Sequence, residues 1–176
     1  MKTFIVIPAY NEEETVGEVV RRAAGQADTI VVDDGSSDKT PEIARAAGAA
    51  VVSHVVNRGL GAALATGIAA ALSRGAEAIV TLDADLQHDP EEAPRLVLPI
   101  VSGQADVVIG SRLLDPTGMP VYRQAQNQIG NLVTFALFGV RCTDTQSGFR
   151  AFSRRAAEII QIQTDGMEVS SEILQQ

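Results

Sequence analysis

Short apolar runs rich in β-branched residues alternate with alanine-rich runs of helical periodicity over the first two-thirds of the chain. The apolar runs, which lack a polar face, occur at residues 4–7, 30–33, 50–55, 78–82 and 106–109. Between them lie helix candidates at residues 13–24, 41–47, 60–74 and 90–101. Strands without a polar face, separated by helices, are typical of a parallel sheet covered on both sides. The sequence therefore predicts a doubly wound α/β fold with a mostly parallel sheet.

The edges of the predicted helices carry residues that begin and end helices. Ser37 or Asp38 can cap the second helix, and Pro41 and Pro90 suit first-turn positions. Asp89, directly before Pro90, is assigned as an N-cap. Glycines stand where the first three helices should stop, namely Gly25, Gly48 and Gly75.

Length, charge and cysteine content narrow the class of protein. A chain of 176 residues suits one domain, and no linker separates its two halves. The formal net charge of −8 argues against nucleic acid as a partner, so an anionic substrate would need a metal ion or a local arginine cluster. The single cysteine, Cys142, excludes an intrachain disulfide and favours a reducing, cytoplasmic compartment. It has no histidine nearby and is expected to be packed, not nucleophilic.

No segment of the sequence is predicted to span a membrane. The N-terminus begins with a strand-like run and lacks the basic and apolar regions of a signal peptide. The apolar run at residues 129–140 is shorter than the ~20 helical residues that cross a bilayer. This run is expected to form a core helix or, alternatively, to lie on a membrane surface.

Polar side chains follow every predicted strand, at the edge where open parallel sheets bind their ligands. After the fourth strand come Asp83 and Asp85, whose alternate spacing along a strand would place two carboxylates around one site. Two close carboxylates repel each other unless a divalent cation joins them, and the cation keeps positions open for diphosphate oxygens. Gln87 can add a neutral oxygen. The pair thus predicts a metal site, with a purely structural role as the alternative.

Two further strand ends carry less specific signals. The sequence DDGSSD at residues 33–38 is typical of turns, but its carboxylates also suit a nucleoside, with Tyr10 stacking on the base. A second metal site there is another alternative. The sequence GLGAAL at residues 59–64 nearly matches a dinucleotide-binding fingerprint, which would indicate an NAD-dependent oxidoreductase. Because Leu64 replaces the third small residue, a tight turn that brings Arg58 to a nucleotide is favoured.

Taken together, the strand-end segments resemble the family 2 glycosyltransferases of the GT-A fold, in particular the dolichyl- and polyprenyl-phosphate sugar synthases. The matching segments, in the family's order, are IPAYNE (7–12), VDDGSSDKT (32–40), NRGLG (57–61), DADLQH (83–88), GSR (110–112), SGFR (147–150) and GME (166–168). The resemblance implies a single GT-A (Rossmann-like) catalytic domain over residues 1–176, with a nucleotide-sugar half at 1–110 and an acceptor half at 111–176. Family members continue further, so the chain is expected to be truncated at its C-terminus.

The resemblance, together with the strand-end positions, gives a set of expected site residues. Those expected to bind a GDP- or UDP-sugar are Pro8, Tyr10, Glu12, Asp33, Asp34, Arg58, Gly59, Asp83, Ala84 and Asp85. Those expected to hold Mg²⁺ or Mn²⁺ are Asp83, Asp85 and Gln87. Those expected to contact a lipid phosphate are Arg112, Arg123 and Ser147. Residues 110–160 contain six arginines and three acids, so this half is locally basic, as an anionic acceptor requires.

The expected reaction is a direct displacement at the anomeric carbon with inversion. The metal and arginine side chains would neutralise the leaving nucleoside diphosphate. A lipid phosphate is already an anion, whereas a sugar hydroxyl would need a base, for which Glu172 and Asp144 are the candidates. The predicted catalytic residues are Asp83, Asp85, Arg112 and Glu172. A lipid acceptor would also bring the protein to the cytoplasmic face of a membrane as a peripheral protein.

Three other classes of protein remain as alternatives. A sugar nucleotidyltransferase would need a glycine-rich, basic phosphate loop near the N-terminus, which residues 7–12 do not provide. An NAD-dependent oxidoreductase would bind NAD without a divalent metal. A non-catalytic nucleotide-binding module would bind the donor without turning it over.

Overall fold

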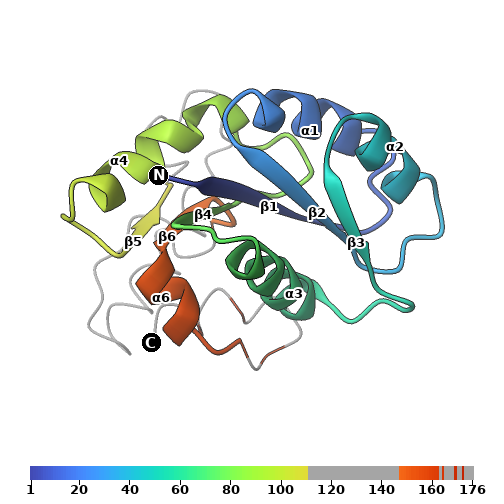
Figure 1. The fold of residues 1–176 in the computed structure, drawn as a ribbon. Coiled ribbons are helices and arrows are strands. Elements are labelled where there is room, and N and C mark those ends of the chain that lie inside the picture. Colours follow the sequence, from blue (N-terminus) through green and yellow to red (C-terminus); the bar gives the residue numbers. More distant parts are fainter. Residues whose placement is uncertain (111–146, 163, 165–168, 170–171, 173–176) are drawn as a thin grey trace, which may run out of the picture.

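The computed structural model of the chain describes residues 1–110 and 147–162, together with residues 164, 169 and 172. In this part of the chain a six-stranded sheet lies between two layers of helices (Figure 1). The strands are β1 (Thr3–Ala9), β2 (Asp28–Asp33), β3 (Ala50–Ser53), β4 (Ala78–Thr81), β5 (Val107–Ile109) and β6 (Arg150–Ser153). Their order across the sheet is β3-β2-β1-β4-β6-β5.

Most of the sheet is parallel, and one strand breaks the pattern. The neighbours β3, β2, β1 and β4 pair in parallel. β6 lies between β4 and β5 and runs antiparallel to both, with Arg150 opposite Thr81 on one side and Ile109 on the other. Because β6 begins where β4 and β5 end, the segment just before it, residues 147–149, lies at the carboxyl edge of the parallel strands.

Helices cover both faces of the sheet, as Figure 1 shows. On one face lie α1 (Val16–Ala24), α2 (Thr40–Ala46) and α4 (Ala93–Val101), the last preceded by a short 3-10 turn, η1 (Pro90–Glu92). On the other face lie α3 (Leu60–Ser73) and α6 (Arg154–Ile159). The predicted α/β fold, doubly wound around a mostly parallel sheet, is confirmed.

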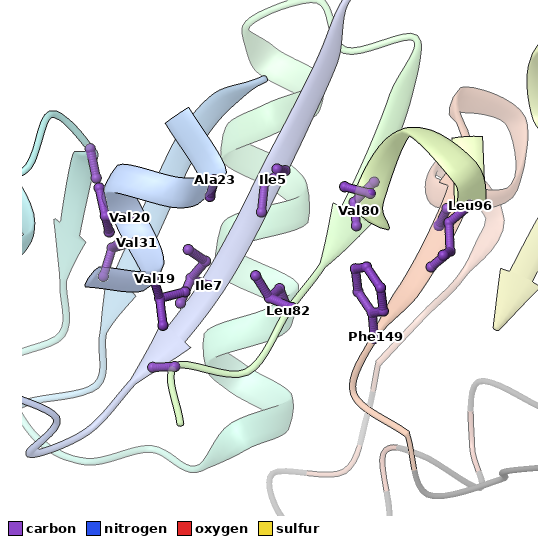
Figure 2. Packing of buried hydrophobic residues seen from close by; sticks show 14 of the residues in the cluster. Ile5, Ile7, Val19, Val20, Ala23, Val31, Val80, Leu82, Leu96 and Phe149 are labelled. Carbon is purple, nitrogen blue, oxygen red and sulfur yellow. The ribbon is translucent and has the colours of Figure 1, made fainter. Parts of the chain in front are cut away.

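Each face of the sheet has its own hydrophobic core. Successive residues of a strand point to opposite faces, so in β1 Ile5 and Ile7 enter one core while Phe4 and Val6 enter the other. All four side chains are buried. Figure 2 shows the first of these cores, to which Phe149 adds its ring from the segment before β6. The runs without a polar face therefore correspond to strands buried on both sides.

Gly67 explains how closely α3 packs on the sheet. A Cβ atom added at this position would overlap Cγ1 of Val6 and would lie 3.1 Å from Cγ2 of Val32. The glycine lets α3 approach β1 and β2 more closely than any other residue would. Leu64, which stands where a dinucleotide-binding fingerprint would have its third small residue, is buried three residues earlier in the helix.

The predicted strands and helices of residues 1–110 are all present, with shifted ends. The helix predicted at 13–24 begins at Val16, and the strand predicted at 50–55 ends at Ser53, with Val55 almost fully exposed. Asp89 is confirmed as a cap, because its side chain accepts from the Glu91 amide. β6 and α6 were not predicted. No helix in the described residues is long and apolar enough to cross a membrane.

Candidate active site

Hydrogen bonds tie the loops after β1 and β2 together. Asn11 adopts a φ of 54°, and its Oδ1 accepts from the Ser37 amide at 2.8 Å. In return, the Asn11 amide donates to Ser36 Oγ at 2.9 Å. One residue further on, the Glu12 amide donates to Thr40 Oγ1 at 2.7 Å. The two loops thus form one connected layer at the carboxyl edge of the sheet.

Asp38 completes the connection between these loops. Its carboxylate accepts from the Glu13 amide at 3.2 Å, and from the amide and hydroxyl of Thr40 at 3.0 and 2.5 Å. Burial alone would raise the pKa of Asp38, but the hydrogen bonds outweigh it and hold the pKa below its ordinary value. Lys39 occupies the N-cap position of α2 and makes no side-chain cap bond, whereas the Asp38 carboxylate accepts from the first amide of the helix, so the predicted capping role is confirmed for Asp38.

The residues predicted to hold the nucleoside differ in how open they are. Tyr10 follows β1 directly and is 47% exposed, so its ring is open to a stacking partner. Pro8 and Glu12 are half-buried. Asp33 is buried, and its Oδ1 accepts from the Ser36 amide at 3.0 Å, which closes the turn after β2. Of these residues, Tyr10 presents the most accessible side chain.

Asp34 holds the loop after β3. Its buried carboxylate accepts from the amides of Arg58 and Gly59 at 2.9 and 2.7 Å. Its Oδ1 also lies 2.6 Å from Nδ1 of His54, whose Nε2 lies 2.9 Å from Thr66 Oγ1 in α3. Because a carboxylate only accepts, the proton of the first of these bonds is on Nδ1. Asp34 therefore has three donors from the protein itself.

Asp83 and Asp85 lie in a turn beyond β4 and not on the strand. The alternation of side chains along a strand, the premise for expecting the two carboxylates to converge, does not apply here. Instead, Asp85 is exposed and its Oδ1 accepts from the Gln87 amide at 3.0 Å, across Leu86 with a φ of 61°. Ala84, between the two acids, is buried. The turn is anchored by Ala84 and presents Asp85 to solvent.

The backbone of Gly148 is the surface on which Asp83 rests. A Cβ atom added at Gly148 would lie 2.5 Å from Cγ of Asp83 and closer still to both carboxylate oxygens, so a larger residue does not fit. The carbonyl oxygen of Gly148 accepts from Thr81 Oγ1 at 2.8 Å, which ties this glycine to the end of β4. A segment more than sixty residues away in the sequence thus packs against one proposed metal ligand.

The residues on either side of Gly148 are buried. Ser147 is fully buried; its Oγ accepts from the Phe149 amide at 3.2 Å and lies 3.3 Å from Nε2 of His88. The rings of His88 and Phe149 are 5.1 Å apart between centroids. These contacts join the segment before β6 to the loop that carries Asp83 and Asp85.

Asp83, Asp85 and Gln87 fit a hard divalent cation by their chemistry. They offer two carboxylates and one amide oxygen, and oxygen ligands suit Mg²⁺ and Mn²⁺. Nowhere in the described part of the chain do three or more His, Cys, Asp or Glu side chains gather as a metal site. A magnesium site built on one or two carboxylates needs fewer protein ligands, because water and substrate phosphates complete it. These residues therefore suit a cation that is shared with a bound diphosphate.

The other predicted residues fall into two groups. Arg112 and Arg123 lie outside the described residues, as do Asp144, Cys142 and the run 129–140. Glu172 is half-buried, and its carboxylate accepts from the amide and hydroxyl of Thr164 at 3.0 and 2.6 Å. Ser147, described above, has no surface exposed to an acceptor phosphate in this structure.

His54 is the residue that sequence reasoning missed. It lies within the run 50–55 that was predicted as strand, where a single histidine does not indicate a functional site. The available signal was its position just after a run of β-branched residues, at the same edge of the sheet as Asp34. Gly148 was noticed only as part of a matching segment, and its contact with Asp83 depends on the pairing of β6.

The acidic strand-end loops and the doubly wound sheet define a GT-A glycosyltransferase fold, and comparisons with known proteins agree. The profile of "Glycosyl transferase family 2" matches residues 4–160. The chain therefore belongs to glycosyltransferase family 2.

Several relatives cover nearly the whole chain. A UDP-N-acetylglucosamine–dolichyl-phosphate N-acetylglucosaminyltransferase of Methanococcus voltae is 33% identical, over 97% of this chain and 78% of the relative. A polyprenol monophosphomannose synthase of Mycolicibacterium smegmatis is 38% identical, over 92% of this chain and 65% of the relative. An uncharacterized protein of Methanocaldococcus jannaschii is 43% identical over 97% of this chain and 73% of the relative.

Solved structures show the same fold. Glucosyl-3-phosphoglycerate synthase of Mycobacterium tuberculosis, in complex with Mn²⁺, UDP-glucose and phosphoglyceric acid, superposes with a TM-score of 0.80 at 28% identity. The match covers 98% of this chain and 64% of the synthase, so this chain spans less than two-thirds of that protein. The same synthase has also been crystallised with Mg²⁺ and UDP.

Proposed function

We propose that this chain transfers a sugar from a GDP- or UDP-sugar to a polyprenyl or dolichyl phosphate, with inversion at the anomeric carbon. The observation that carries the proposal is the turn after β4, with Asp85 exposed and Asp83 packed against Gly148, at the same edge of the sheet as the loops after β1 and β2. Membership of family 2 and relatives named for lipid-phosphate acceptors support the same reaction.

The donor site would use the connected loops of β1, β2 and β3. Tyr10 would stack on the base, because its ring is open to solvent at the strand end. Asp33 and Asp34 would accept from the base or ribose through the carboxylate positions their own loops leave open. Arg58 is exposed while its amide is fixed by Asp34, so its guanidinium can reach a diphosphate.

The diphosphate would bind at the turn after β4. Asp83, Asp85 and Gln87 would hold Mg²⁺ or Mn²⁺ there, and the cation would supply neutralisation of the leaving nucleoside diphosphate. Asp83 packs against the backbone of Gly148, whereas Asp85 is exposed and is bound to the Gln87 amide through its Oδ1. Both carboxylates lie at the carboxyl edge of the sheet, as the donor loops do, so nucleoside and diphosphate would occupy one continuous site.

The acceptor would enter from the half of the chain after residue 110. Arg112 and Arg123 remain the proposed contacts for its phosphate, because residues 110–160 contain more arginines than acidic residues. Because Ser147 is buried under the β4 turn, we propose that it supports this turn instead of touching the acceptor. A phosphate acceptor needs no strong base, so Glu172 would act as one only if the acceptor were a hydroxyl. A lipid acceptor would place the protein at the cytoplasmic face of a membrane.

Replacement of Asp85 by Asn tests the metal and donor assignment. Calorimetric titration with UDP, GDP and their sugars, with and without Mn²⁺, should show metal-dependent binding by the parent chain. The variant should bind at least about tenfold more weakly, because it loses a charged metal ligand while its fold is unaffected. Asp28→Asn is the matched control, since Asp28 is exposed at the start of β2 on the opposite edge. Equal titrations for Asp85→Asn and the parent would disprove the assignment, and NAD binding without metal would favour an oxidoreductase.

A further inference from the structure

The loop between β3 and α3 has almost no hydrophobic anchor. Val55 is 99% exposed and Val56 is 64% exposed, so burial of these side chains does not hold the loop in place. The backbone of this loop instead packs against the backbone of Gly35, where an added Cβ would lie 2.7 Å from the carbonyl carbon of Val56. The conformation of this loop must therefore depend on polar contacts.

Those contacts converge on Asp34. The loop ends with Gly59, at a φ of 93°, and its amide and that of Arg58 both donate to the Asp34 carboxylate. Oδ1 of Asp34 accepts hydrogen bonds from Arg58 and His54. Within the described residues, Oδ2 of Asp34 accepts from Gly59 alone. Oδ2 thus keeps capacity for one more donor, such as a base or ribose group.

His54 fixes the orientation of that carboxylate. Its ring is buried, with a side-chain exposure of 7%, and it bridges Asp34 in the loop after β2 and Thr66 in α3. Its own amide donates to the carbonyl of Asp33 at 2.8 Å, so the base of the ring is fixed as well. A buried imidazole held at both nitrogens and at its backbone cannot rotate without breaking these bonds.

We propose that His54 is a positioning residue for the donor site: with Thr66 it orients Asp34, and Asp34 in turn holds the loop 54–59 and Arg58 in the conformation that receives the nucleotide. This proposal rests on the proposed function for its ligand, but the network itself exists without a ligand. His54 touches neither donor nor acceptor and acts only through Asp34.

Three substitutions separate the parts of the network. His54→Ala removes both ring contacts. His54→Asn retains an N–H donor close to the position of Nδ1 and loses the contact with Thr66. Thr66→Val removes the hydroxyl without changing the shape of the side chain. Ser53→Ala is the control, because Ser53 precedes His54 at the end of β3, is exposed and makes no recorded contact with Asp34.

The first measurement needs no nucleotide. Amide hydrogen exchange at Arg58 and Gly59 should be slow in the parent chain and in Ser53→Ala, and at least about tenfold faster in His54→Ala. His54→Asn should restore most of the protection, and Thr66→Val should lie between the two. Unchanged exchange at these amides in His54→Ala, or equal loss in His54→Asn, would overturn the proposal.

The second measurement uses UDP and GDP with Mn²⁺ as probes. His54→Ala should weaken nucleotide binding about tenfold, the effect expected for one lost hydrogen bond to a charged group, and should raise the donor KM more than it lowers kcat. A purely structural role would lower the melting temperature and leave the dissociation constant of the folded protein unchanged, which would refute the proposal. If the parent chain bound neither nucleotide, the proposed function would fail, while the exchange result would still decide whether His54 holds the loop.

Discussion

Gly148 offers a sharp test of how the fold builds its metal site. In Gly148→Ala the new methyl group would lie 2.5 Å from Cγ of Asp83, whereas non-bonded carbon atoms ordinarily approach to about 3.5 Å. The carboxylate or the turn must therefore move by about 1 Å. The backbone itself does not forbid alanine, because Gly148 is not among the residues with a positive φ.

The size of the effect follows from this displacement. Metal ligands tolerate shifts of about 0.2 Å, and a misplacement of about 1 Å can reduce a catalytic rate about 100-fold. We therefore expect Gly148→Ala to lower kcat/KM for the donor about 100-fold, equivalent to roughly 2.7 kcal/mol of transition-state stabilisation. The free energy of unfolding should fall by about 1–3 kcal/mol, the range for one overpacked methyl group.

The assay compares donor turnover and Mn²⁺-dependent nucleotide binding with the melting temperature of each variant. Gly25→Ala is the control, because Gly25 ends α1 with a φ of −71° and an added Cβ would meet only the Arg22 carbonyl at 3.5 Å. In a double-mutant cycle, Gly148→Ala should cause little further loss of turnover in a chain that already carries Asp83→Asn, if Gly148 acts through Asp83. Parent-like turnover in a well-folded Gly148→Ala, or full additivity in the cycle, would refute the reasoning.

Two further predictions concern the fold. Gly67→Ala should lower the free energy of unfolding by about 1–3 kcal/mol, because overlap with Val6 outweighs the roughly 1 kcal/mol gained in helix propensity; a more stable variant in urea titrations would contradict it. The folded-state pKa of Asp38 lies below its ordinary value of 3.8, so this carboxylate stabilises the fold above that value, and the contribution is lost as the pH falls through the lowered pKa. Asp38→Asn should therefore be less stable than the parent near pH 6, and the difference should shrink near pH 2. A difference independent of pH would show that the hydrogen bonds from Thr40 and Glu13 do not depend on the negative charge of Asp38.

Much of the fold followed from local sequence patterns. The five strands and four helices of residues 1–110 were predicted because apolar runs and their bounding glycines and prolines act over a few neighbouring residues. The position of the acidic segments at the strand ends followed directly from those elements. The errors were at the ends of elements, such as Val55: β3 ends at Ser53, which pairs with Asp33, the last residue of β2.

The candidate site was only partly predictable. The residue types of Asp83, Asp85 and Gln87 indicated a metal, but their convergence was inferred from a strand that ends before them. His54 gave no signal, because its role depends on Asp34, twenty residues away, and on Thr66 in another element. Contacts of this kind are set by packing and cannot be read from local periodicity.

The sequence by itself determined that this chain forms a doubly wound sheet with acidic loops along one edge, because hydrophobic periodicity and turn residues specify elements locally. Only the tertiary structure decided what fixes those loops. The pairing of β6 between β4 and β5 brings Gly148 under Asp83, although more than sixty residues separate them. The short run Arg150–Ser153 carries too little pattern to predict a strand, and its backbone groups find their partners in β4 on one side and β5 on the other, both distant in the sequence.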